Sequence, residues 1–109
     1  MKMSKEIEKK DYYNILYGFY QPLLTTKQCQ IFEDYYAEDY SLAEIAEDLA
    51  ISRNAVWDSL KKVTDKLDDY ESKMHLVANN QLLMEYLQTL EKYTNDDGQK
   101  IIQKIREME

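Results

Sequence analysis

Residues 41–63 read SLAEIAEDLAISRNAVWDSLKKV, and this stretch decides the fold. Two short amphipathic segments flank a turn near Ala50, and each begins with a serine that can cap a helix, Ser41 or Ser52. Ala46 supplies the small residue that two closely crossing helices need where they touch. Apolar residues at helical spacing surround it: Ile45, Leu49, Ile51, Val56 and Leu60. The pattern predicts a helix-turn-helix, with Ala50 in the left-handed conformation at a strain on the order of 1 kcal/mol.

The composition favours helix along the whole chain. Its 109 residues include only two glycines and one proline, and these are the residues that interrupt helices. We predict an all-α protein with one domain over residues 1–109, a helix-turn-helix core at about 25–70 and a C-terminal helical extension at about 71–109. No stretch of the sequence approaches the length of an apolar membrane span. The lysine-bearing start MKMSKEIEKK is not followed by the apolar core of a signal peptide. We therefore expect a cytoplasmic location without membrane association.

Two helices are expected before the motif. Pro22 ends the first, at about residues 5–20, and a capping box of Thr25 and Gln28 starts the second at Thr25 or Thr26. The inward stripe predicted for the first helix is incomplete, consisting of Ile7, Ile15, Leu16 and Phe19.

The helix that begins at Ser52 has an apolar stripe longer than the motif needs. Its members alternate at spacings of four and three: Val56, Leu60, Val63, Leu67, Tyr70, Met74 and Val77. This heptad spacing predicts a stalk that packs on a C-terminal helix, on another subunit, or on both. We therefore expect a homodimer. Beyond residue 80 we expect one further helix, a turn at TNDDG (residues 94–98) and a short terminal amphipathic helix.

Catalytic and metal-binding residue sets are not evident. The chain has one cysteine, Cys29, and one histidine, His75, which cannot make an internal disulfide or a zinc site between them. Cys29 sits where a helical core residue belongs. No nucleophile–base pair or phosphate-binding loop is visible, so we expect no enzymatic activity, no metal and no cofactor.

The charge distribution disfavours duplex DNA. The formal net charge is −7, and residues 26–49 hold one lysine against seven acidic residues, a local charge of −6. Residues 50–73, by contrast, hold five basic and five acidic residues. Affinity for a duplex comes largely from neutralising phosphates, so steering toward DNA should be poor.

The exposed face of the recognition helix is the candidate binding site. It comprises Arg53, Asn54, Trp57, Asp58, Lys61 and Lys62. Arginine and asparagine can read guanine and adenine edges, whereas Asp58 would repel a phosphate. Trp57 is typical of a protein interface or a structured-RNA contact. Two alternatives remain: a solvated face of mixed charge, and a Trp57 that folds back against the N-terminal helix.

The motif resembles the last DNA-binding region of bacterial sigma factors, in which an SLxEIAxxLxIS frame precedes the recognition helix. Over nearly its whole length, including YYAEDYSLAEIAE and DYESKMHL, the chain resembles the YlxM family of small helix-turn-helix proteins of Gram-positive bacteria. That resemblance implies a regulatory link to the signal recognition particle, because the family's gene lies beside those of the particle's GTPase and receptor. We expect the acidic pairs, Glu33 with Asp34 and Glu38 with Asp39, to be solvated faces. The alternative is a docking patch for a basic partner, which the targeting GTPase would supply if the resemblance holds.

Two functions therefore compete. The first is a non-enzymatic regulator or adaptor that binds the targeting GTPase of the particle or its RNA. The second is a transcription regulator that binds duplex DNA through Arg53, Asn54, Lys61 and Lys62.

Overall fold

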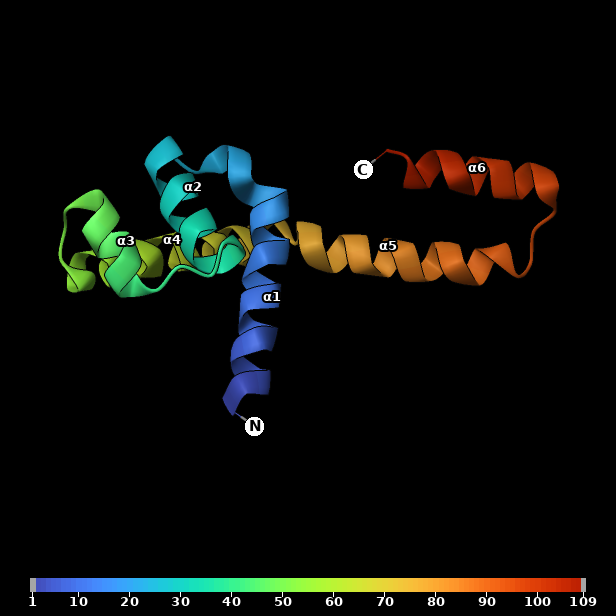
Figure 1. Cartoon of the computed structure of the whole chain (residues 1–109). Coiled ribbons are helices and arrows are strands. Elements are labelled where there is room, and N and C mark those ends of the chain that lie inside the picture. The colour runs from blue at the N-terminus through green and yellow to red at the C-terminus, as the bar shows by residue number, and fades with distance from the viewer. Residues whose placement is uncertain (1, 109) are drawn as a thin grey trace. The chain divides into compact units, whose positions relative to one another are not determined.

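The chain folds entirely into helices and turns over the residues that the structure describes. The computed structural model describes the backbone of residues 2–108 and the side chains of residues 8–108. The α-helices are α1 (Lys2–Tyr20), α2 (Thr26–Phe32), α3 (Leu42–Leu49), α4 (Arg53–Met74), α5 (Leu76–Glu91) and α6 (Asp96–Arg106) (Figure 1). A 3-10 turn, η1 (Gln21–Leu23), follows α1, and a π-helical turn, η2 (Glu33–Ala37), follows α2. The prediction of an all-α fold is confirmed.

The helices form two compact units. The first unit spans Met1–His75 and the second spans Leu76–Glu109. The division lies a few residues beyond residue 71, where the sequence places the start of the C-terminal extension.

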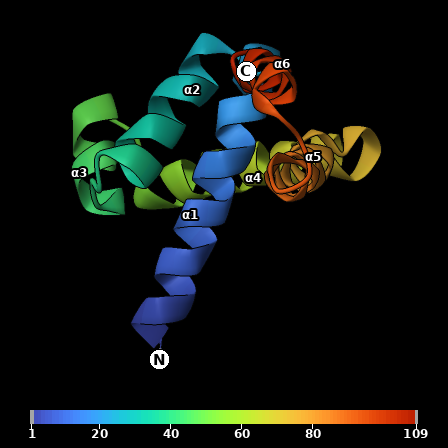
Figure 2. The same cartoon turned by 90° about the vertical axis from the view of Figure 1, so that its right-hand side faces the viewer.

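The recognition helix α4 is the centre of the first unit. Helices α1, α2 and α3 each pack against it, and α1 crosses it (Figures 1 and 2). The buried apolar residues of this unit are Leu16, Tyr17, Tyr20, Ile31, Phe32, Ile45, Ala46, Val56, Leu60, Val63 and Leu67. All four helices contribute, so the core of the unit is continuous around α4.

The predicted stalk is wrong in two respects. Helix α4 ends at Met74 because His75 adopts a left-handed conformation, with φ of 55°. Val77 therefore belongs to the next helix, α5. Moreover, the stripe is buried from residue 56 to residue 67 within the first unit, against α1, α2 and α3. That part of the stripe is a domain core and is not available to another subunit.

The inward face of α1 also differs from the predicted stripe. Leu16 is buried as expected, but Ile15 and Phe19 are exposed, and tyrosines at 17 and 20 take their place. The side chain of Ile7 lies outside the described residues. The reason is an aromatic stack across the core. The Tyr17 and Phe32 ring centroids lie 4.3 Å apart, and those of Phe32 and Tyr36 lie 4.5 Å apart. Large aromatic rings bury more area than Ile15 would, so the tyrosine face turns inward.

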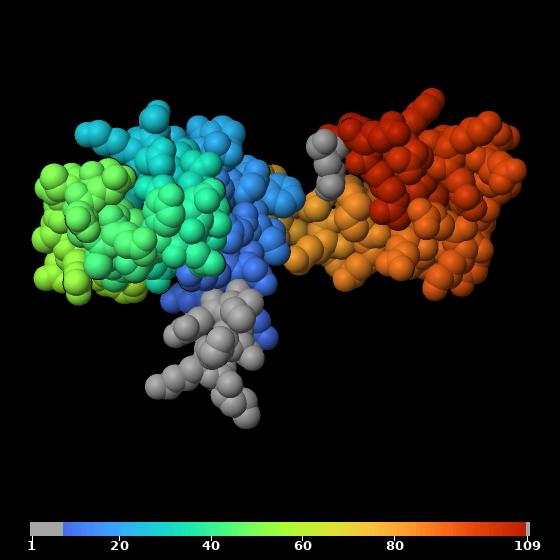
Figure 3. Space-filling model, in the orientation of Figure 1, coloured from blue at the N-terminus to red at the C-terminus, as the bar shows by residue number. Residues whose placement is uncertain are grey.

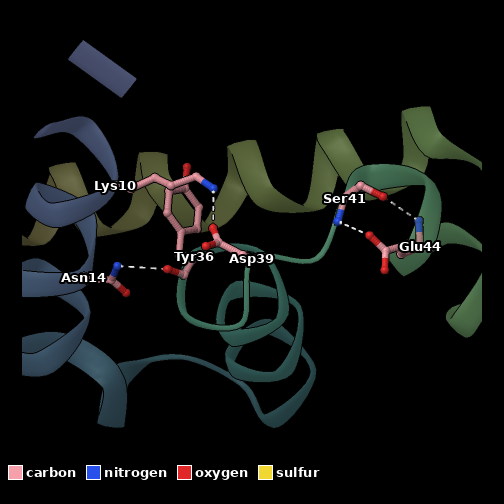
Figure 4. A network of polar contacts seen from close by, with 6 residues as sticks. All are labelled: Lys10, Asn14, Tyr36, Asp39, Ser41 and Glu44. Carbon is pink, nitrogen blue, oxygen red and sulfur yellow. Dashed lines mark hydrogen bonds and ion pairs between the residues drawn. The ribbon is translucent and has the colours of Figure 1, made fainter. Parts of the chain in front are cut away.

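The starts of α2 and α3 agree with the sequence. Thr25 and Gln28 form the predicted capping box at the start of α2. Ser41 and Glu44 form a second one, in which the Glu44 N–H donates to Ser41 Oγ and the Ser41 N–H donates to Glu44 Oε1, each at 3.1 Å (Figure 4). Each box satisfies two backbone N–H groups that the first turn would otherwise leave without partners.

The π-helical turn η2 packs against both α1 and α3. Asn14 Nδ2 donates to the Tyr36 carbonyl at 3.0 Å, and Lys10 Nζ lies 3.1 Å from Asp39 Oδ1 (Figure 4). Tyr35 and Tyr36 are adjacent in the chain, yet both are half-buried. The wider i→i+5 winding of a π-helix separates adjacent side chains less than an α-helix does.

The second unit is a pair of helices, α5 and α6, that lie side by side (Figures 1 and 2). Its buried apolar residues are Val77, Leu87 and Ile102. Asn95 caps α6 by accepting from the Gly98 N–H at 3.0 Å. The turn predicted at residues 94–98 is therefore wrong in its second part, because residues 96–98 already belong to α6. Arg106 also lies 3.0 Å from Glu91 and links the two helices.

Candidate functional site

The turn of the motif has a well-defined backbone geometry. Ala50 lies at φ 58° and ψ 43°, in the left-handed region. The Ile51 N–H donates to the Ala46 carbonyl at 3.0 Å and the Ala50 N–H to the Glu47 carbonyl at 3.3 Å, which is the hydrogen-bond pattern of a Schellman motif. The prediction for Ala50 is confirmed, and this turn sets the direction in which α4 leaves α3.

The start of α4 presents two of the candidate residues. Ser52 Oγ accepts from the Ala55 N–H at 3.0 Å and caps the helix. Arg53 and Asn54 are then the first two helical residues, and both are exposed. Their side chains are thus accessible at the end of the helix that enters the major groove in DNA-binding members of this fold.

All six candidate residues are exposed on α4, namely Arg53, Asn54, Trp57, Asp58, Lys61 and Lys62. Lys61 Nζ lies 3.0 Å from Asp65 Oδ1, one turn further along the helix. Neither Arg53 nor Lys62 forms an ion pair with a residue whose side chain is described. The face therefore carries two unpaired cations beside a paired lysine and the Asp58 carboxylate.

Trp57 has a position between the two alternatives drawn from the sequence. Its side chain is 49% exposed, yet it lines a cleft of about 170 Å³ between α4 and α1. We call this the Trp57 cleft, and its lining residues are Lys9, Tyr13, Tyr36, Trp57, Leu60, Lys61, Thr64, Asp65 and Asp68. The indole is neither buried as core nor fully free in solvent.

The far wall of the Trp57 cleft is aromatic and hydrogen-bonded. The Tyr13 hydroxyl donates to Asp68 Oδ2 at 2.9 Å, and the Tyr13 ring meets the edge of Tyr36 at 5.9 Å between centroids. Burial, with smaller contributions from Tyr35 and Asp68, raises the pKa of Tyr36 to about 12. Burial also raises the pKa of Tyr13, aided by its hydrogen bond to Asp68. Both hydroxyls are therefore neutral donors at physiological pH.

A second hollow lies on the other flank of α4, and sequence reasoning missed it. This turn groove has a volume of about 440 Å³ and is lined by Lys27, Gln28, Gln30, Ile31, Leu49, Ile51 and Ser59. Leu49 and Ile51 were assigned to the apolar frame of the motif, but each is 41% exposed. Helical spacing could not reveal this, because the left-handed turn at Ala50 places both residues at its edge.

The surface beside the recognition helix is acidic. Glu44, Glu47 and Asp48 are exposed on α3, which lies next to η2 in the first unit (Figure 3). With the other exposed acidic residues of the segment 26–49, they form one flank of the candidate site, whereas Asp34 of that segment is buried. Such a flank repels phosphate and attracts basic groups.

Other site types are not found in the described part of the chain. Among residues 8–108, no group of three or more histidine, cysteine, aspartate or glutamate side chains is placed to hold a metal ion. No helix within the same described part is long and apolar enough to cross a membrane.

The fold and the exposed second helix of the motif define a helix-turn-helix protein. Residues 7–108 match the UPF0122 family, described as "Putative helix-turn-helix protein, YlxM / p13 like". The chain belongs to this family. It is 48% identical over 108 residues to a UPF0122 protein of Lactococcus lactis subsp. cremoris strain MG1363, covering 95% of this chain and 93% of the relative. A UPF0122 protein of Limosilactobacillus reuteri strain DSM 20016 is 46% identical over 92 residues, or 84% of this chain and 81% of the relative. One from Streptococcus pneumoniae serotype 19F strain G54 is 47% identical over 93 residues, or 84% of each chain.

Proposed function

We propose that this protein is a non-enzymatic, cytoplasmic adaptor or regulator of the signal recognition particle pathway. Its partner is the targeting GTPase of the particle or the complex of that GTPase with its RNA. The resemblance to the YlxM family points to this pathway. The observation that carries the proposal is the half-exposed Trp57 on a recognition helix flanked by the acidic helix α3.

The electrostatics support a protein contact over a duplex. A half-exposed tryptophan offers a large apolar area that a partner can desolvate. The flanking segment, residues 26–49, carries −6, and Asp58 stands among the cations of α4 itself. Backbone phosphates close to α3 would be repelled, whereas a basic protein surface would be attracted.

Fluorescence of Trp57, the only tryptophan, tests the proposal directly. The protein is titrated separately with the targeting GTPase, its RNA and random duplex DNA at moderate salt. A saturable change with the GTPase or its RNA, but not with the duplex, is expected. Added salt should weaken a protein contact only modestly, since phosphate binding is the strongly salt-dependent kind. A nuclease-resistant pulldown of the GTPase separates direct protein binding from binding through RNA.

A second candidate function is sequence-specific binding of duplex DNA. It is favoured by Arg53 and Asn54, which are exposed at the start of α4 and are able to contact base edges. Retention on a specific operator that disappears in an Arg53→Ala, Asn54→Ala double variant would support it. A fluorescence response to duplex DNA that fades steeply with salt would do the same and would refute the first proposal.

The proposal includes a homodimer formed through the terminal helices. The stalk no longer supports it over residues 56–67, which are buried within one chain. The support comes instead from apolar side chains of α5 that are exposed: Leu82, Leu83, Tyr86 and Leu90. Sedimentation equilibrium should give twice the chain mass of 13.1 kDa, and a Leu83→Glu, Tyr86→Glu variant should shift the protein to monomer. A monomeric parent protein would refute this part of the proposal.

A further inference from the structure

The Trp57 cleft has a chemistry that the proposed function does not by itself explain. Aromatic rings from three elements meet there beside two carboxylates, Asp65 and Asp68. We propose that this cleft binds the side chain of an arginine from a basic segment of the protein partner. The inference rests on the proposed function, because it assumes that the partner is a protein.

The aromatic walls suit a flat cation. Trp57 is half-exposed, and Tyr36 and Tyr13, which line the same cleft, meet edge to face. Tryptophan is the best aromatic partner for a cation, and a guanidinium can also stack flat on a ring. The same chain already uses this kind of contact, because Lys10 Nζ lies 4.6 Å from the centre of the neighbouring Tyr35 ring.

Two carboxylates supply the acceptors that a guanidinium needs. Asp68 accepts one hydrogen bond, from Tyr13 at 2.9 Å, and Asp65 accepts one, from Lys61 at 3.0 Å. The second oxygen of each carboxylate receives no hydrogen bond from any side chain in the described range 8–108. An ionised carboxylate can accept at both oxygens, so each of these two lining residues retains an acceptor oxygen for a further donor.

A phosphate or a nucleotide fits this lining less well. The charged residues of the cleft are two lysines, Lys9 and Lys61, and the two aspartates, which sum to zero. Lys61 is already paired with Asp65, and Lys9 is exposed and long enough to turn its ammonium into solvent. An anion entering the cleft would meet both carboxylates, whereas nucleic-acid sites need a positive surplus.

Size and surroundings agree with a single side-chain head group. The volume of about 170 Å³ equals that of several water molecules at roughly 30 Å³ each, which is too little for a helix. Tyr36 belongs to the segment of residues 26–49, whose charge is −6, so the approach to the cleft attracts a basic peptide.

Two short peptides test the inference on the full-length protein. The probes are a GRGRG peptide blocked at both ends and its GKGKG counterpart, with Trp57 emission as the readout. A saturable change with the arginine peptide is expected, at least about threefold tighter than with the lysine peptide, because only the guanidinium stacks flat. Equal affinities, or no saturable response to the arginine peptide, would overturn the inference.

A matched pair of variants tests the location. Asp65 and Asp69 both lie on α4 and both pair with a lysine four residues away, but only Asp65 lines the cleft. Asp65→Asn should weaken the arginine peptide about threefold or more, while Asp69→Asn should leave it unchanged. An equal loss in both variants would mean that only the overall charge matters, and the inference would fall.

The role of the indole and the alternative ligand are tested with a labelled peptide. Anisotropy of a fluorescent GRGRG peptide should show about tenfold weaker binding to Trp57→Ala, and a smaller loss for Trp57→Phe, which keeps a ring. Circular dichroism checks that each variant is folded. If a short single-stranded uridylate RNA bound the cleft more tightly than the arginine peptide, the cleft would be a nucleic-acid site and the inference would be refuted.

The peptide experiment and the GTPase experiment fail separately. If the GTPase binds but the arginine peptide does not, this inference is refuted and the proposed function stands. If the peptide binds with the expected preference but neither the GTPase nor its RNA does, the cleft is an arginine site for another protein, and the proposed function is refuted.

Discussion

Replacing Ala50 with glycine should stabilise the protein. Ala50 lies in the left-handed region, with φ of 58° and ψ of 43°, at the turn of the motif. An L residue other than glycine bears a strain of about 1–2 kcal/mol there. Glycine relieves this strain but gains freedom in the unfolded chain, at a cost of about 0.4–1 kcal/mol. Because the Ala50 side chain is exposed, its removal sacrifices little packing. The free energy of unfolding should therefore rise by about 0.5–1 kcal/mol.

The assay is thermal or urea unfolding followed by Trp57 fluorescence, which reports on the first unit, Met1–His75. For a unit of this size, the gain corresponds to a rise in Tm of about 2–8 °C. Ala43→Gly is the matched control, since Ala43 lies within α3 in ordinary helical geometry. As the second residue of α3, it should lose up to about 1 kcal/mol. The same chemical change should thus have opposite signs at two positions seven residues apart in one motif. If Ala50→Gly lost as much stability as Ala43→Gly, the assignment of the left-handed turn would be refuted.

Three further predictions concern the core, the tyrosines and the second unit. Leu67→Ala, which empties a fully buried position on α4, should lower the free energy of unfolding by about 2–5 kcal/mol in urea titrations. Met74→Ala, at an exposed position of the same helix, should lose less than about 1 kcal/mol. Similar losses in the two variants would contradict the burial of the stripe within one chain. The pKa of Tyr36 is raised to about 12 from 10.0, so its contribution to stability is complete below pH 10 and is lost as the pH rises toward 12. The alkaline decline in stability should therefore be smaller in Tyr36→Phe. An unchanged decline would argue against a hydroxyl that is partly shielded from water. Gly98→Ala should destabilise α6 despite the higher helix propensity of alanine, since a Cβ there would lie 1.7 Å from Thr94 Oγ1. A rise in the helical circular dichroism signal or in Tm would refute the predicted clash.

Local features of the fold were predictable because they depend on neighbouring residues. Thr25 with Gln28, and Ser41 with Glu44, form the capping boxes that their spacing predicts. Ala50 takes the left-handed conformation because the two helices of the motif must turn sharply between them. The exposure of Arg53 and Asn54 follows in the same way from their place at the start of α4.

The candidate site was only partly predictable. The sequence identifies the face of α4 that points away from the apolar stripe, but it leaves open whether Trp57 is free or covered. The structure places the half-exposed Trp57 in the lining of a cleft to which α1 and η2 also contribute. Tyr13 and Tyr36 are more than 20 residues from Trp57 in the chain, and no local pattern links them to it.

The sequence by itself determined where α2, α3 and α4 begin, where the motif turns, and which side of α3 and of most of α4 is apolar, since caps and periodicity act within a few residues. Only the tertiary structure decided what covers each apolar side. The stripe of α4 is covered by α1, α2 and α3 over residues 56–67. It is interrupted at His75, whose left-handed backbone could not be predicted because the residue is not a glycine. A strain of about 1–2 kcal/mol is small beside the burial of several large side chains. Packing therefore selected the tyrosine face of α1, the end of α4 and the walls of the Trp57 cleft.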